Sequence, residues 1–95
     1  MTSDAFYDHI RGRVRGLLIA VADQLPAVTV GLVDDLLDSN EQGVALEILS
    51  EMLVESNARI STDVLSVFGE LVDEMQLDPA NVDRLRPHLA KEGEI

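Results

Sequence analysis

The sequence predicts an all-α fold, a compact bundle of four to five short helices that forms a single domain over residues 1–95. A chain of 95 residues fits one domain with a modest core. Hydrophobic residues make up 46% of the chain and aromatic residues only 3%, so the core must consist of Leu, Val, Ile and Ala. Such side chains suit interdigitating helices, and they recur here at helical spacing between recognisable start and stop signals.

The first helix is expected from Ser3 or Asp4 to Gln24, where Pro26 stops it because proline lacks a backbone donor. Part of this segment, 11–22, imitates a secretory signal, but two acidic residues lie in what would be the positive leader. A helical stripe already accounts for its apolar residues. With no cysteine and no run of about 20 apolar residues, we expect a cytoplasmic protein without a membrane span.

The second and third helices are expected on either side of a turn near residue 40. Thr29 is predicted to cap the second helix, with Val28 and Val33 as a hydrophobic staple, and that helix should end near Asp38. The third should run from Asn40 or Glu41 to Glu55. A capping box is expected between Ser39 and Gln42.

Two further helices complete the expected bundle. The segment 56–61 is predicted to be a turn, with Ser61 capping a fourth helix that carries a buried apolar side. Asp78 is expected to cap a short fifth helix with Pro79 at its first position, fading at Arg86 and Pro87. Residues from about 90 to 95 should form a frayed tail.

The charge is strongly acidic and unevenly distributed. The net charge is −11, and the segment 23–78 holds thirteen acidic residues against the single basic residue Arg59. This charge opposes direct binding to nucleic acid and favours a basic protein partner. Carboxylates four residues apart repel each other, as in Asp34/Asp38 and Glu70/Glu74, and nothing adjacent in the sequence offsets them. The acidic side is interpreted either as a docking surface or as a solvated face.

Two other interpretations concern the residues around the turn at position 40. Asp38, Asn40, Gln42 and Gly43 match the first half of a calcium loop, but the twelfth position holds Leu49 where a bidentate Glu is needed. Alternatively, Ser39 after Asp38 resembles the modified serine of acyl and peptidyl carrier proteins. The helix cap is favoured over both.

Catalysis is poorly supported by the sequence. His9 and His88 lie at opposite ends of the chain, with no phosphate loop or nucleophile signature near them, and each is expected to be an exposed helix residue. We therefore predict no enzyme, no catalytic residue, no metal and no cofactor.

The segments 36–55 and 58–79 resemble the MafI-type immunity proteins, small helical antidotes to secreted polymorphic toxins of bacterial competition. The similar features are Glu41, Gly43, the Ala45-Leu46-Glu47 helix ending in Glu55, and Met75-Gln76-Leu77. Where the family often has an aromatic residue at or just after 41–43, this chain has none, which leaves the toxin subtype open. The resemblance implies an antitoxin, a cytoplasmic protein that occludes a cognate toxin domain, often a nuclease.

The leading hypothesis is a toxin inhibitor that binds a basic toxin domain without catalysis. Its expected contact surface is the acidic face formed by Asp34, Asp35, Asp38, Glu41, Glu47, Glu51 and Glu55. The alternatives are a carrier-like protein modified at Ser39, and a generic helical interaction module in which Gly69 marks a close helix approach.

Overall fold

The structure, a computed structural model, describes residues 3–90 and confirms the all-α class. The elements are α1 (Ser3–Val21), a 3-10 turn η1 (Ala22–Gln24), α2 (Ala27–Asp38), α3 (Gln42–Glu55), α4 (Thr62–Glu74), α5 (Ala80–Asp83) and a second 3-10 turn η2 (Arg86–His88). The tail expected to fray falls mostly on 91–95, outside the described residues. Within residues 3–90, no helix is both long and apolar enough to cross a membrane.

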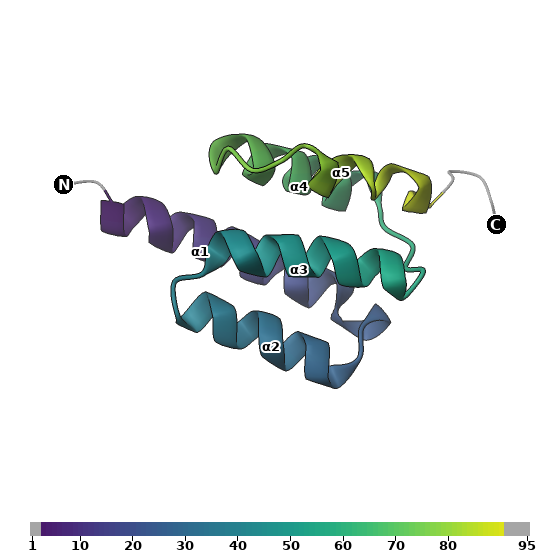
Figure 1. The fold of residues 1–95 in the computed structure, drawn as a ribbon, viewed down its shortest axis with the longest axis horizontal. Helices are drawn as coiled ribbons and strands as arrows, with labels where there is room; N and C mark the ends of the chain where they lie inside the picture. Colours follow the sequence, from purple (N-terminus) through teal and green to yellow (C-terminus); the bar gives the residue numbers. More distant parts are fainter. Residues whose placement is uncertain (1–2, 91–95) are drawn as a thin grey trace.

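The helices are arranged around α1 and α3. Figure 1 shows α2 on one side of this pair and α4 with α5 on the other side. The hairpin of α2 and α3 is antiparallel, since only three residues connect the two helices. Helices α2 and α4 therefore contact α1 on different sides. This arrangement determines which carboxylates can pair with the arginines of α1.

The core is aliphatic, as the composition predicts. Phe68 is its one aromatic residue, and Leu, Val, Ile and Ala supply the other buried apolar side chains. Helical spacing predicts the buried side of α4 correctly. On α3 it is only partly right, because Ala45 and Leu49 are buried but Ile48 and Met52, expected in the core, are partly buried, and Leu46 and Leu53 are buried instead. On α2, Val33 and Leu37 are fully buried, and Val30 and Leu36 pack partly buried beside them.

Two of the predicted helix caps are wrong. Helix α2 begins two residues before Thr29, because the Pro26 carbonyl accepts hydrogen bonds from the Thr29 and Val30 amides. Thr29 is therefore buried inside the helix, and Val28 is 80% exposed, so the expected staple does not form. Ser39 ends α2 and caps nothing in α3, whose N-cap is Glu41 without a side-chain hydrogen bond.

The later caps agree better with prediction. The Ser61 hydroxyl accepts a hydrogen bond from the Val64 amide at 3.1 Å, which confirms it as the N-cap of α4. At α5, the Asp78 carboxylate accepts from the Ala80 amide at 3.0 Å. The helix itself begins one residue later than expected, because Pro79 occupies the N-cap position.

Three helices end in the same left-handed turn. Asn40, Asn57 and Gln76 follow α2, α3 and α4 with φ values of 61°, 51° and 55°. In each turn the amide of the next residue reaches back to a carbonyl five positions earlier, as Glu41 does to Leu36 at 2.8 Å. This is the Schellman arrangement, in which glycine is the usual left-handed residue.

The end of the bundle opposite the α2–α3 turn is tied by long-range hydrogen bonds. The Gln24 side-chain amide accepts from the Arg59 amide at 2.8 Å and donates to the Arg59 carbonyl at 2.7 Å. Ile60 and Leu89 form an isolated parallel β-bridge. The His88 ring Nδ1 lies 3.0 Å from the Ala58 carbonyl, so His88 is half-buried, contrary to the expectation that it is exposed. His9 is exposed, as expected.

Candidate functional site: the acidic ridge of α3

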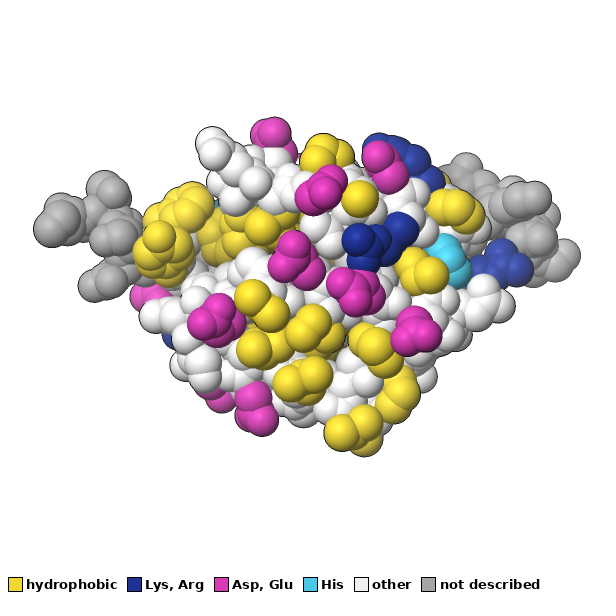
Figure 2. Space-filling view, in the orientation of Figure 1, with side chains coloured by type: hydrophobic (Ala, Val, Ile, Leu, Met, Phe, Trp, Pro, Cys, Tyr) yellow, Lys and Arg dark blue, Asp and Glu magenta, His cyan; other side chains and the backbone are white. Residues whose placement is uncertain are grey.

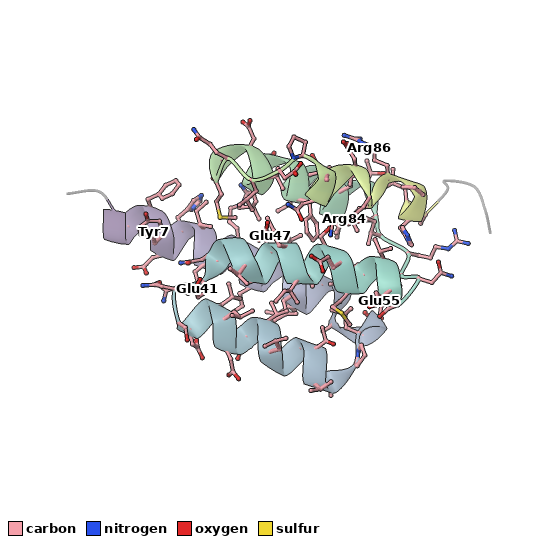
Figure 3. The ribbon with its side chains drawn as sticks, viewed as in Figure 1. Tyr7, Glu41, Glu47, Glu55, Arg84 and Arg86 are labelled. Carbon is pink, nitrogen blue, oxygen red and sulfur yellow. The ribbon has the colours of Figure 1, made fainter. Side chains whose placement is uncertain are left out.

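The candidate site is built on the outward side of α3. Glu47, Glu51 and Glu55 recur every four residues, which places them along one side of the helix. Figure 3 shows Glu47 and Glu55 along α3 on the face toward the viewer, with Glu41 at the start of the same helix. We call Glu41, Glu47, Glu51 and Glu55 the acidic ridge.

Most of the ridge has no counter-ion among the described residues. Glu51 lies 3.6 Å from the guanidinium of Arg84, a separation that makes a weak and partly solvated ion pair. Glu41, Glu47 and Glu55 form no ion pair with any residue in the range 3–90. Glu41 and Glu55 are exposed and Glu47 is half-buried, so a partner can reach all three.

The expected residues on α2 divide into two groups. Arg15 of α1 lies 3.0 Å from a carboxylate oxygen of Asp34 and 3.0 Å from one of Asp38. The hydrogen bonds that the Arg15 guanidinium donates, to Asp34 first and to Asp38 second, raise its pKa above the ordinary value. Asp34 and Asp38 therefore face α1, whereas Asp35 is exposed on the outer side of α2.

The other side of α1 repeats this arrangement. Arg13 forms an ion pair with Glu70 and lies 3.6 Å from Glu74, the second pair of carboxylates spaced by four residues. Nothing adjacent in the sequence offsets the repulsion within Asp34/Asp38 and Glu70/Glu74, but Arg15 and Arg13 offset it in the folded chain. The counter-ions come from α1, which is distant in sequence but lies beside both α2 and α4.

An apolar stripe beside the ridge was not anticipated. Helical spacing aligns a row on α2 with a row on α3 across the outer side of the hairpin. We define this apolar stripe as Val28, Leu32 and Leu36 of α2 with Val44, Ile48 and Met52 of α3. Figure 2 shows hydrophobic side chains gathered over α2 and α3, with acidic side chains on both sides of them. The signal that could have revealed it is the excess of apolar residues on α2, more than one buried face requires.

The residues of the other two interpretations have different roles. Asp38 binds Arg15, and the buried Gln42 side chain donates to the Tyr7 carbonyl and to the Asn40 side chain, both at 3.3 Å. Leu49 is fully buried. Among the described residues, no three His, Asp or Glu side chains converge as a metal site would require. Ser39 is exposed in the turn after α2.

A groove of about 440 Å³ lies at the α2–α3 turn. Its apolar wall comes from the start of α1, from Val44 and from the end of α4, and two of the left-handed residues, Asn40 and Gln76, line it. Glu41 and Glu74 are the acidic residues at this groove. It adjoins the acidic ridge at Glu41 and the apolar stripe at Val44.

Gly69 does not mark a close helix approach within residues 3–90. A Cβ placed on Gly69 would have no neighbour within 4 Å among the described atoms, so this glycine is not needed for packing in the chain.

Comparisons of the chain with protein-family models, with curated proteins and with solved structures find no match.

Proposed function

We propose that this protein is an immunity protein, which binds a basic toxin domain stoichiometrically through the acidic ridge of α3 and so neutralises it. One observation carries the proposal. Carboxylates that face α1 are neutralised by Arg13 and Arg15, whereas Glu41, Glu47 and Glu55 on the outer face have no such counter-ion within residues 3–90.

This contrast supports a binding surface over a merely solvated acidic face. Glu47, Glu51 and Glu55 follow one another along one side of α3 with a single weak ion pair among them, whereas a face that serves only solubility can mix charges at lower repulsion. A row of unpaired carboxylates attracts a basic partner and raises the association rate by roughly 10- to 1000-fold at low salt. The segment 36–55, which resembles MafI-type immunity proteins, includes α3, the helix that carries the acidic ridge. A cytoplasmic location follows from this role, because an antidote must meet the toxin where the toxin acts.

A nuclease domain fits this partner chemistry. Enzymes that cleave nucleic acid present basic surfaces to phosphates, so a protein with an acidic ridge can occupy the same surface. The antidote then needs no catalytic group of its own, and it inhibits by excluding the substrate.

The test begins with the neighbouring gene, which we expect to encode a large secreted protein with a variable C-terminal domain, and continues with co-expression of that domain and this chain. We expect the two proteins to purify together in equimolar amounts at low salt, and the chain to protect cells that express the domain. If no complex forms at low salt and cells are not protected, the proposal is wrong.

A further inference from the structure

Among residues 3–90, no helix covers the outer side of the α2–α3 hairpin. On the inner side, α1 packs against both α2 and α3, and the fully buried apolar residues of the two helices belong to the core that they share with it. On the outer side, Val28, Leu32 and Val44 are 80%, 47% and 41% exposed. Leu36, Ile48 and Met52 are only partly buried between them.

The charged side chains beside this apolar stripe are mainly acidic, and the basic Arg84 lies 3.6 Å from Glu51 at the margin on α3. On α3, Glu47 and Glu51 lie three residues beyond Val44 and Ile48, toward α5, and Glu55 follows Met52 in the same way. On α2, Asp35 lies three residues beyond Leu32 and is exposed. An apolar centre with acidic margins on both sides is what Figure 2 shows over this hairpin.

We propose that the apolar stripe binds a helix of the partner protein that has one apolar side flanked by Lys or Arg. The proposal rests on the binding role proposed above and names the segment that is bound. Two adjacent antiparallel helices offer a groove into which a third helix fits by its i, i+3, i+4 and i+7 residues. Each row of the stripe spans eight residue steps, roughly 12 Å, which matches about two turns of such a helix.

Charge complementarity selects this occupant over a second copy of the chain. In a two-fold dimer through the stripe, the carboxylates on the margins of one copy would meet those of the other. Like charges brought together in this way disfavour the contact, and the net charge of −11 adds long-range repulsion. Lysine or arginine on the margins of a partner helix would meet the same carboxylates favourably.

The experiment uses the full chain and a synthetic 18-residue helical peptide of leucine and lysine, with leucine on one side. Two further peptides serve as controls: a scrambled sequence of the same composition, and a leucine–glutamate peptide of the same pattern. The binding variants are Leu32→Ser and Val44→Ser. Ile19→Ser is the matched control, because Ile19 is a 72% exposed apolar residue on α1 outside the stripe. Thermal melts verify that all three variants remain folded.

We expect the leucine–lysine peptide to bind, the two control peptides to bind at least about 10-fold more weakly, and Leu32→Ser and Val44→Ser each to weaken binding by about 10-fold. Ile19→Ser should bind like the unmodified chain. Absence of peptide binding, or equal binding by Leu32→Ser and Ile19→Ser, would overturn the inference. So would a dimer in sedimentation analysis that dissociates in Leu32→Ser, since the stripe would then bind a second copy.

Failure of this inference is distinguishable from failure of the proposed function. If the toxin domain binds the unmodified chain and both stripe variants equally well, the immunity role stands and the apolar stripe is not its docking surface. If the toxin domain does not bind the chain at all while the peptide does, the proposed function fails and the stripe still recognises a basic amphipathic helix.

Discussion

Arg15 on α1 holds Asp34 on α2 through two nitrogens, with Nε at 3.1 Å and Nη2 at 3.0 Å from the same carboxylate oxygen. The same Nη2 also lies 3.0 Å from Asp38. One guanidinium thus bridges two carboxylates on successive turns, which relieves their mutual repulsion and joins two helices. Arg13 likewise pairs with Glu70 and Glu74 on α4. The two arginines therefore join α1 electrostatically to the helices on either side of it.

Replacing Arg15 should therefore cost more than replacing an ordinary surface arginine. Arg15→Ala is expected to lower the free energy of unfolding by about 0.5–1 kcal/mol, the upper range for a partly exposed pair, because the repulsion between Asp34 and Asp38 returns. Urea denaturation at low salt measures this change in the free energy of unfolding. In an Asp34→Asn, Asp38→Asn background the same substitution should have almost no effect. An equal loss in both backgrounds would show that the bridge contributes nothing.

The hydroxyl of Ser50 is buried between α3 and α5, where it donates to the Asn81 carbonyl at 2.7 Å. Ser50→Ala should lower the free energy of unfolding by about 1–2 kcal/mol, since it leaves a buried carbonyl without this donor. Ser66→Ala, at an exposed position on α4, is the matched control and should change little. Similar urea midpoints for the two variants would contradict the role assigned to Ser50.

Gln76 adopts a left-handed conformation with φ of 55°. Its side chain is longer than that of asparagine, whose short side chain can stabilise this conformation by a local hydrogen bond. Gln76→Gly should raise the free energy of unfolding by about 0.5–1 kcal/mol, because relief of backbone strain exceeds the added freedom of the unfolded chain. Asn40→Gly should gain less, since asparagine tolerates this conformation better. Thermal unfolding compares the two. A Gln76→Gly variant less stable than the unmodified chain would show that its turn is not strained.

Ser39 should not carry a phosphopantetheine arm. Because it ends α2 and does not begin α3, its hydroxyl does not lie at a helix N-terminus, where backbone amides would stabilise a phosphate ester. Co-expression with a phosphopantetheinyl transferase and intact-mass measurement should give no mass gain. A gain that disappears in Ser39→Ala would restore the carrier interpretation.

Local patterns in the sequence predicted most of the helices. The features that these patterns did not predict depend mostly on contacts between segments distant in the sequence. Ser61 and the buried side of α4 were predicted because the cap and the helical stripe both lie within a few residues. Thr29 was misassigned because the preceding proline already starts the helix, and burial of a threonine on the core side has no local signal. The bond between Gln24 and the Arg59 backbone joins residues 35 positions apart, beyond any periodicity.

The candidate site was predicted in the same partial way. Glu47, Glu51 and Glu55 share a helix, so their common side follows from spacing alone. Asp34 and Asp38 were grouped with them because helix spacing does not say which side of α2 faces α1. A signal did exist: Arg13 and Arg15 are two residues apart, on nearly opposite sides of α1, and each matches one acidic pair on a flanking helix.

The measurement that tests the central claim most directly is the association rate of the toxin domain with a Glu47→Gln, Glu55→Gln variant at two salt concentrations. Its control is Asp63→Asn, Asp73→Asn, which removes the same charge from exposed positions on α4. We expect the ridge variant to associate about 10-fold more slowly at low salt, with a weaker salt dependence, while the control stays close to the unmodified chain. Equal association rates for the two variants would show that net charge alone attracts the partner and that the acidic ridge is not its docking site.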